Sequence, residues 1–213
     1  MENTTFQGTP EEWRQVHQPW ELCYHRHENF RWPKRQVEWD AQWESVFGFA
    51  GLNPATFQAD DVLLDVGCGS RPVLDYFKAG QKHFVDPLLE GYLQIPAMKP
   101  YWQEHDRTCL YAIPAEERIE NLAGKCDLVL CWNVLDHSFE PFKILKNMAV
   151  YAKPGATLLI GTDLHEKPHM GHPGIGSRAE FMAIIKTQFK VVKEARRGAF
   201  HAGRDVSFLL QKL

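Results

Sequence analysis

The stretch from Asp61 to Pro72, DVLLDVGCGSRP, limits the possible fold more than any other part of this chain. Its apolar run predicts a buried strand, which leads into a turn containing Gly67 and Gly69. Glycine lets the backbone turn sharply and approach a ligand without a clash at Cβ. The next segment, PVLDYFKAG, predicts a helix that ends at Gly80. A strand, a glycine turn and a helix in this order are typical of an α/β sheet that binds a nucleotide at the turn.

Strand and helix patterns alternate through the rest of the chain. After the strand at 62–66, strands are predicted over 83–86, 108–113, 127–132, 156–162, 190–195 and 205–213. Helices are predicted over 114–124, over 138–155, and after the Ser-x-x-Glu capping box at 177–180. The last two strands lie close enough in sequence to pair as a hairpin. The pattern predicts an α/β, Rossmann-like fold with a mostly parallel seven-stranded sheet, covered on both faces, and a C-terminal antiparallel hairpin.

The N-terminal part differs from this pattern. Residues 1–34 are rich in Trp, His, Pro and charge without a clear period, so we expect a loop-rich arm. Trp39, Trp43, Val46 and Ala50 then follow at helical spacing and predict an amphipathic helix. We therefore divide the chain into an arm with a cover helix, residues 1–52, and a ligand-binding domain, residues 53–213.

Composition narrows the cellular setting and the partners. The net charge of −3 over 213 residues gives no general attraction to nucleic acid, so we expect no nucleic-acid partner. The five cysteines are scattered and form no C-x-x-C pair, which favours a reducing compartment. The N-terminus lacks a signal-peptide pattern, and no apolar run is long enough to span a bilayer. We expect a cytoplasmic protein without a membrane span.

The residues around the glycine turn indicate which nucleotide is bound. Asp86 ends the second predicted strand, 19 residues after Gly67, where a carboxylate can accept hydrogen bonds from a ribose diol. The fingerprint for NAD needs a third glycine, whereas this chain has Ser70-Arg71-Pro72. Asp65 before the turn would also repel a pyrophosphate but suits a positively charged amine or sulfonium. Arg71 itself has two open interpretations, as a cap on the helix surface or as a contact to a second substrate.

Taken in order, these motifs resemble those of the class I S-adenosylmethionine-dependent methyltransferases, from about Asp61 to the C-terminus. The segments LLDVGCGS, FVDP, CDLVLCWNVLDHSFEP and KILKNMAVYAKPGATLLIGT are similar to four successive motifs of that family. The resemblance implies S-adenosylmethionine as cofactor and S-adenosylhomocysteine as product. It implies that the cofactor is bound by Asp65, Gly67, Cys68, Gly69, Asp86, Pro87, Leu88, Ala115, Glu116 and Asn133.

Histidines are the candidates for chemistry on the methyl acceptor. Methyl transfer to a hydroxyl needs a group that removes a proton, and histidine suits that role near neutral pH. His137 follows the fourth central strand, while His165 and His172 follow the fifth, so all three can face the methyl group. We predict O-methylation of a small-molecule or glycan-like acceptor, with one of these histidines as the base.

Three alternatives bear on this interpretation. Asp163, His165, Glu166, His169 and His172 are potential metal ligands, but their spacing matches no metal signature, so we predict no metal. The chain can also be a regulatory subunit that binds the cofactor without transferring its methyl group. The third alternative is an NAD-dependent enzyme, which a nicotinamide titration would distinguish.

Overall fold

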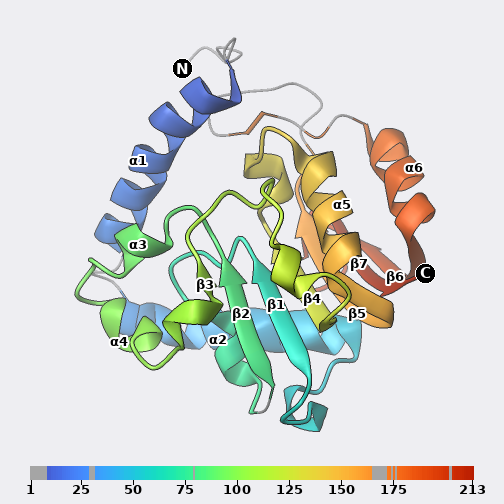
Figure 1. Ribbon diagram of the computed structural model, residues 1–213, viewed down its shortest axis with the longest axis horizontal. Helices are drawn as coiled ribbons and strands as arrows, with labels where there is room; N and C mark the ends of the chain where they lie inside the picture. The colour runs from blue at the N-terminus through green and yellow to red at the C-terminus, as the bar shows by residue number, and fades with distance from the viewer. Residues whose placement is uncertain are drawn as a thin grey trace.

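The computed structural model describes residues 9–28, 32–78, 80–164, 172–173, 175, 177–201 and 203–213. Its strands are β1 (Val62–Val66), β2 (Gln81–Val85), β3 (Leu110–Tyr111), β4 (Cys126–Trp132), β5 (Ala152–Thr162), β6 (Phe189–Arg196) and β7 (Val206–Lys212). Its α-helices are α1 (Pro10–Glu28), α2 (Trp32–Ala50), α3 (Leu89–Tyr92), α4 (Lys99–Trp102), α5 (Pro141–Tyr151) and α6 (Arg178–Gln188). Figure 1 shows these elements arranged around one central sheet.

The sheet has the predicted topology. Its strand order is β3-β2-β1-β4-β5-β7-β6, with parallel pairing from β3 to β5 and antiparallel pairing of β7 with both β5 and β6. The strand order reverses between β1 and β4, which follow each other in space but not in sequence. In open sheets of this kind, ligands bind beyond the carboxyl ends of the strands at that reversal.

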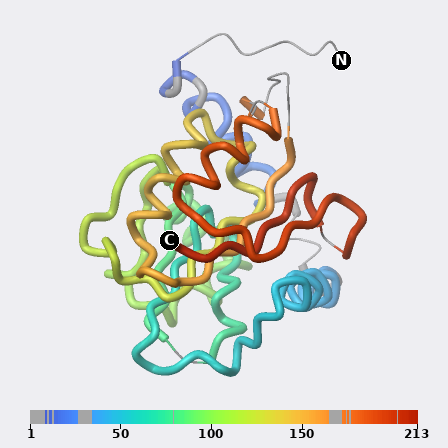
Figure 2. The backbone as a smooth tube through the Cα atoms, turned by 90° about the vertical axis from the view of Figure 1, so that its right-hand side faces the viewer, coloured from blue at the N-terminus to red at the C-terminus, as the bar shows by residue number. Residues whose placement is uncertain are grey.

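Apolar side chains pack on both faces of the sheet. Leu64 belongs to the core that includes α5 and α6, whereas its neighbour Leu63 belongs to the core that includes α2. Successive side chains of a strand point to opposite faces, so an apolar run such as VLL serves both cores. Figure 2 shows α2 on the opposite side of the sheet from α5.

The described part of the arm contains the helix α1 rather than the loop-rich segment we expected. Thr9 and Glu12 form a reciprocal cap at its start: the Thr9 amide donates to the Glu12 carboxylate at 2.7 Å, and the Glu12 amide donates to Thr9 Oγ1 at 3.2 Å. Pro10 occupies the first helical position, where its missing N–H costs no hydrogen bond. Proline is unusual in the interior of a helix, so Pro19 made a helix hard to recognise in the sequence of this segment.

Three further predicted elements are shorter than expected. The helix predicted up to Gly80 is a 3₁₀ turn, η3 (Val73–Tyr76), because Phe77 extends to pack edge-on against Phe47. The predicted helix over 114–124 is the 3₁₀ turn η5 (Glu120–Leu122), and β3 has only two residues. By contrast, the capping box at Ser177 and the β6–β7 pairing are confirmed. Within the described residues, no helix is both long and apolar enough to cross a membrane.

Candidate active site

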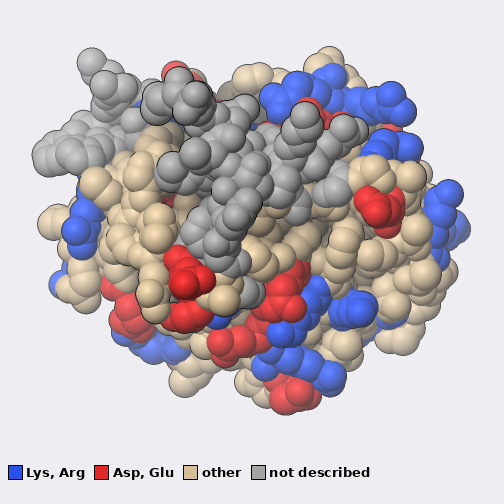
Figure 3. Space-filling view, turned by 90° about the horizontal axis from the view of Figure 1, so that it is seen from above, with Lys and Arg blue, Asp and Glu red and all other residues tan. Residues whose placement is uncertain are grey.

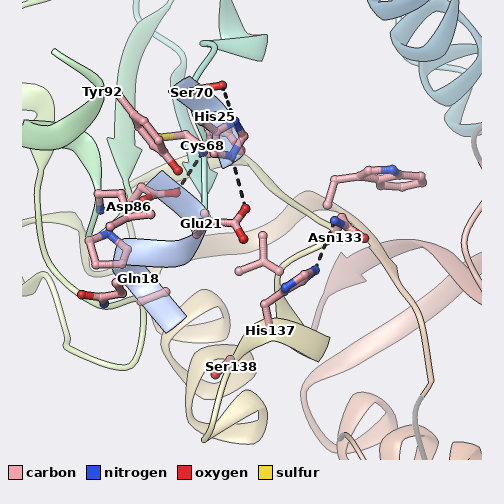
Figure 4. A pocket seen from close by; sticks show the side chains of 18 of the residues that line it. Gln18, Glu21, His25, Cys68, Ser70, Asp86, Tyr92, Asn133, His137 and Ser138 are labelled. Atoms are coloured by element: carbon pink, nitrogen blue, oxygen red, sulfur yellow. Dashed lines mark hydrogen bonds and ion pairs between the residues drawn. The ribbon is translucent and has the colours of Figure 1, made fainter. Parts of the chain in front are cut away.

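A cavity of about 340 Å³ lies where the sheet meets the N-terminal helices. Its walls come from the glycine turn after β1, the residues that follow β2 and β4, the loop at 114–116, and the inner sides of α1 and α2. Figure 4 shows side chains from these elements pointing toward one space. The volume falls in the range of roughly 300–1,000 Å³ that is usual for small-molecule sites.

The glycine turn forms the floor of this cavity. Gly67 and Gly69 have φ angles of 69° and 65°, a backbone conformation that favours glycine. The Gly67 amide donates to the Val85 carbonyl at 2.7 Å and the Cys68 amide donates to the same oxygen at 3.3 Å. These bonds fix the turn to the end of β2, next to Asp86.

Two buried carboxylates flank the turn. Asp86 accepts hydrogen bonds from the Gly69 amide at 2.9 Å and from the Leu88 amide at 2.8 Å. Burial raises the pKa of Asp86 to about 6, although these two hydrogen bonds oppose the shift. Burial also raises the pKa of Asp65 well above its ordinary value, and the charge of Asp86 adds to this effect. The two acids therefore make a site that favours a positively charged or hydroxyl-rich ligand.

The loop at 114–116 is held on the cavity wall by side chains. Asn147 on α5 donates to the carbonyls of Ala115 and Glu116, both at 3.0 Å. Ser138 donates to the Glu116 carboxylate at 2.8 Å. These contacts hold the loop at the wall of the cavity that Pro87 and Leu88 also line.

Asn133 and His137 follow β4, where the strand ends at the cavity. Asn133 has a positive φ of 62°, the only such non-glycine residue in the described part of the chain, and its amide donates to the Gly161 carbonyl at 2.7 Å. Its side-chain nitrogen lies 3.4 Å from His137 Nε2 (Figure 4). His137 ends the 3₁₀ turn η6 (Leu135–His137) and lines the cavity.

A second histidine, His172, lies next to His137 and contacts the buried carboxylate of Asp136. Asp136 accepts a hydrogen bond from Thr162 Oγ1 at 3.0 Å and contacts His172 Nδ1 at 3.0 Å. The rings of His137 and His172 lie 4.3 Å apart, measured between their centroids. Burial would raise the pKa of Asp136, but the contact with His172 and the charge of His137 outweigh it and lower the pKa. Burial lowers the pKa of His137, which favours its neutral form, although Asp136 opposes that shift.

Helix α1 adds a third group of titratable side chains, of which His17 and Glu21 were not singled out from the sequence. His17, Glu21 and His25 lie four residues apart on one face of the helix and line the cavity. His17 lies against His137, with ring centroids 6.0 Å apart. The four-residue spacing is visible in the sequence, but it carries this meaning only once the segment is known to be helical.

The ten residues that the resemblance assigned to the cofactor all line this one cavity: Asp65, Gly67, Cys68, Gly69, Asp86, Pro87, Leu88, Ala115, Glu116 and Asn133. Among the predicted catalytic histidines, His137 lines it, His172 contacts Asp136 without lining it, and His165 is outside the described residues. Arg71 is buried. It donates to Gln36 at 2.7 Å and stacks over the Tyr101 ring at 4.2 Å, so it braces the turn against α2 and α4.

Two overlapping groups of described side chains can present ligand atoms to a metal ion. They are His17 with Glu21 and His137, and Asp136 with His137 and His172, and within each group the ligand atoms lie within 4.8 Å of one another. Neither is the loop set considered from the sequence, in which His165, Glu166 and His169 lie outside the described residues.

Comparisons with known proteins agree with this architecture. A family model described as a methyltransferase domain matches residues 18–188. The tRNA U34 carboxymethyltransferase of Campylobacter fetus subsp. fetus (strain 82-40) is 27% identical over 126 residues, which cover 58% of this chain and 44% of that protein. The chain thus spans about half the length of the curated relatives that it matches.

Solved structures share the fold at low sequence identity. The 1,6-didemethyltoxoflavin-N1-methyltransferase of Burkholderia thailandensis, with bound 1,6-didemethyltoxoflavin and S-adenosylhomocysteine, superposes with a TM-score of 0.66. It is 17% identical and covers 98% of this chain and 92% of its own. A SAM-dependent methyltransferase from Aquifex aeolicus has a TM-score of 0.53 at 17% identity, covering 97% of this chain and all of its own.

Proposed function

Since this chain belongs to the methyltransferase domain family and is a class I S-adenosylmethionine-dependent methyltransferase, we propose that it methylates an oxygen of a small-molecule or glycan-like acceptor, with His137 as the base. The finer parts of this proposal are the acceptor, the atom methylated and the residue that takes the proton. Each is argued below from the side chains that line the cavity.

The cavity residues suit this cofactor. The positive φ angles of Gly67 and Gly69 leave the turn open to close approach, and the Asp86 carboxylate lies beside it within hydrogen-bond distance of Gly69. We propose that Asp86 holds the ribose hydroxyls, that Asp65 lies near the methionine amine, and that the adenine lies against Leu88. When bound, the cofactor supplies a methyl group on a positively charged sulfur.

The position of His137 is the observation that carries the assignment of the base. It lines the cavity at the end of β4, beside Asn133 and next to the buried carboxylate of Asp136. A neutral imidazole can take a proton from a hydroxyl, and burial lowers the pKa of His137 in the direction that keeps it neutral. We propose that Asp136 orients the histidines, since both Thr162 and His172 hold its carboxylate in place.

RNA is the second candidate acceptor, because the curated relatives are named as tRNA-modifying enzymes. The cavity volume of about 340 Å³ and the net charge of −3 support the small-molecule acceptor instead. Figure 3 shows basic side chains gathered at one corner of the face seen from above, with acidic and basic side chains mixed along the lower edge. The described side chains on this face lack the broad single-sign field that is typical of RNA-binding faces.

The test separates cofactor binding from methyl transfer. Calorimetry should detect S-adenosylhomocysteine binding to the wild type and a loss of at least tenfold in affinity for Asp86→Ala. A panel of hydroxylated small molecules, glycosides and tRNA is then screened by formation of S-adenosylhomocysteine. His137→Gln should lower turnover by about 10²–10⁴-fold with unchanged cofactor affinity, while His201→Gln in an exposed loop should have no effect. Binding without turnover on any acceptor would favour a regulatory subunit, and activity only on tRNA would favour the second candidate.

A further inference from the structure

We propose that Glu21 of helix α1 is a positioning residue for His137, and that contact of α1 with the glycine turn holds it there. The proposal rests on the function proposed above, because it assigns a second carboxylate to the same base.

The contacts of Glu21 fix its carboxylate at the cavity. One oxygen lies 3.2 Å from His25 Nε2 and the other lies 3.7 Å from His17 Nε2. Glu21 is partly buried, and Figure 4 shows it between His25 and His137. Its carboxylate, His17 and His137 present atoms that all lie within 4.8 Å of one another.

His25 connects Glu21 to the cofactor turn. Its Nδ1 lies 3.1 Å from Ser70 Oγ, and its ring packs edge-on against Tyr92 at 5.2 Å between centroids. A neutral His25 that carries its proton on Nε2 donates to Glu21 and accepts from the Ser70 hydroxyl, so one tautomer satisfies both contacts. Ser70 is itself fixed, because its carbonyl accepts a hydrogen bond from Trp102 Nε1 at 2.9 Å. The line Ser70–His25–Glu21 therefore joins the turn to a carboxylate that lies within 4.8 Å of the base.

The charges around His137 come from several elements. Asp136 lies on its own turn, His17 and Glu21 face it from α1, His172 from the segment after β5, and Arg204 from the segment before β7. Asp136 and Glu21 favour a charged imidazole, whereas His172 and Arg204 disfavour it. Glu21 is thus the second carboxylate next to the base, and it is the one supplied by the cover helix.

This arrangement matters at the moment of transfer. The acceptor oxygen bonds the methyl carbon as the carbon–sulfur bond breaks, the sulfur keeps the electron pair, and the acceptor proton passes to His137. The resulting imidazolium has the Asp136 carboxylate at 3.6 Å and the Glu21 carboxylate within 4.8 Å, and both stabilise the charge that develops there. The proton then leaves to water when the products separate.

The matched pair of variants is Glu21→Gln and Glu11→Gln. Glu11 lies on the same helix, and its side chain is exposed, with a contact only to Arg14 and Gln15 among the described residues. Both variants are titrated by NMR as S-adenosylhomocysteine complexes with EDTA present, and the His137 signal is assigned by its absence in His137→Gln. We expect the His137 titration midpoint to fall by about half a unit or more in Glu21→Gln and to stay unchanged in Glu11→Gln.

Kinetics supply the second readout. In Glu21→Gln, kcat should fall about tenfold with little change in KM or in affinity for S-adenosylhomocysteine, and Glu21→Asp should recover part of the loss. An unchanged His137 midpoint in a folded Glu21→Gln protein would overturn the proposal. So would wild-type activity that EDTA abolishes and Zn²⁺ restores, because Glu21 would then serve a metal. Full activity in His137→Gln would instead overturn the proposed function, which keeps the two failures distinct.

Discussion

Gly67 and Val134 approach so closely that a β-carbon built on Gly67 would lie 2.3 Å from Val134 Cγ2. This contact joins the turn after β1 to the segment after β4, at the point where the strand order reverses. The glycine is therefore required by packing as well as by its φ of 69°. Gly69 has a similar φ, but a β-carbon there would meet no atom within 4 Å.

This difference predicts two distinct outcomes for alanine substitutions in the turn. Gly67→Ala should lower the free energy of unfolding by about 2–4 kcal/mol, through overpacking and backbone strain together. Gly69→Ala should cost only about 1–2 kcal/mol from backbone strain, yet weaken S-adenosylhomocysteine binding, because its β-carbon would enter the cavity. Urea unfolding and calorimetry on both variants check this. Equal stabilities of the two variants would show that the Val134 contact is unimportant.

The raised pKa of Asp86 predicts that cofactor binding depends on pH. An ionised carboxylate accepts hydrogen bonds from the two ribose hydroxyls more strongly than a protonated one, and burial raises the pKa of Asp86 to about 6. Binding should therefore be full at pH 7.5 and weaken about tenfold by pH 5 as the carboxylate becomes protonated. Calorimetry with S-adenosylhomocysteine at several pH values measures the effect. Asp86→Asn should bind weakly throughout, and a wild-type affinity that stays constant down to pH 5 would contradict the assignment.

The grouping of Asp65, the glycine turn and Asp86 in one cavity could be predicted from the sequence because these residues follow strands that are recognisable locally. Asp65, the glycine turn and Asp86 are separated by a fixed strand-turn-strand path, and parallel strands bring their carboxyl ends to one edge. The register of β1 against β2 then places Asp86 at the turn without any further information.

The other half of the site could not be predicted in this way. The helical period of α1 could not be recognised in the sequence, because the segment contains Pro19 and mixes Trp, His and charged residues. Without a predicted helix, His17 and Glu21 could not be assigned to one side of it. Their contact with His137 is between elements far apart in sequence and depends on how α1 docks. The predicted helix before Gly80 failed for a related reason, since the tertiary packing of Phe77 overrode local propensity.

The hydrogen bonds of Asn147 connect α5 to the cavity wall, which predicts that this residue supports both stability and cofactor binding. Its side chain donates to two carbonyls of the 114–116 loop, and Asn147→Ala would leave these carbonyls without a partner from this side chain. We expect a loss of about 2–3 kcal/mol in the free energy of unfolding and weaker S-adenosylhomocysteine binding, since the loop lines the cavity. Asn121→Ala, which removes an exposed contact to Tyr111, is the matched control and should stay within about 0.5 kcal/mol. If both variants unfolded alike, the loop would need another anchor.

The lowered pKa of His137 predicts how the stability of the folded protein changes with pH. Burial lowers the pKa of His137 in the folded protein, whereas the unfolded chain has the ordinary histidine value near 6.5. Below that pH the unfolded state binds more protons, so the free energy of unfolding contributed by this group falls as the solution becomes more acidic. Other groups, including Asp86 with its raised pKa, also change the free energy of unfolding in this pH range. Their contributions cancel when a His137 variant is compared with the wild type.

The comparison that isolates His137 is the wild type against His137→Gln, with His201→Gln as the exposed control. Urea unfolding at pH 7.5 and pH 5.5, without cofactor, should show a smaller loss of stability on acidification in His137→Gln than in the wild type. His201→Gln should behave like the wild type. An NMR titration midpoint for His137 above 6.5 would reverse the sign of this effect on stability. It would mean that the charges of Asp136 and Glu21 outweigh burial and hold the imidazole in its charged form.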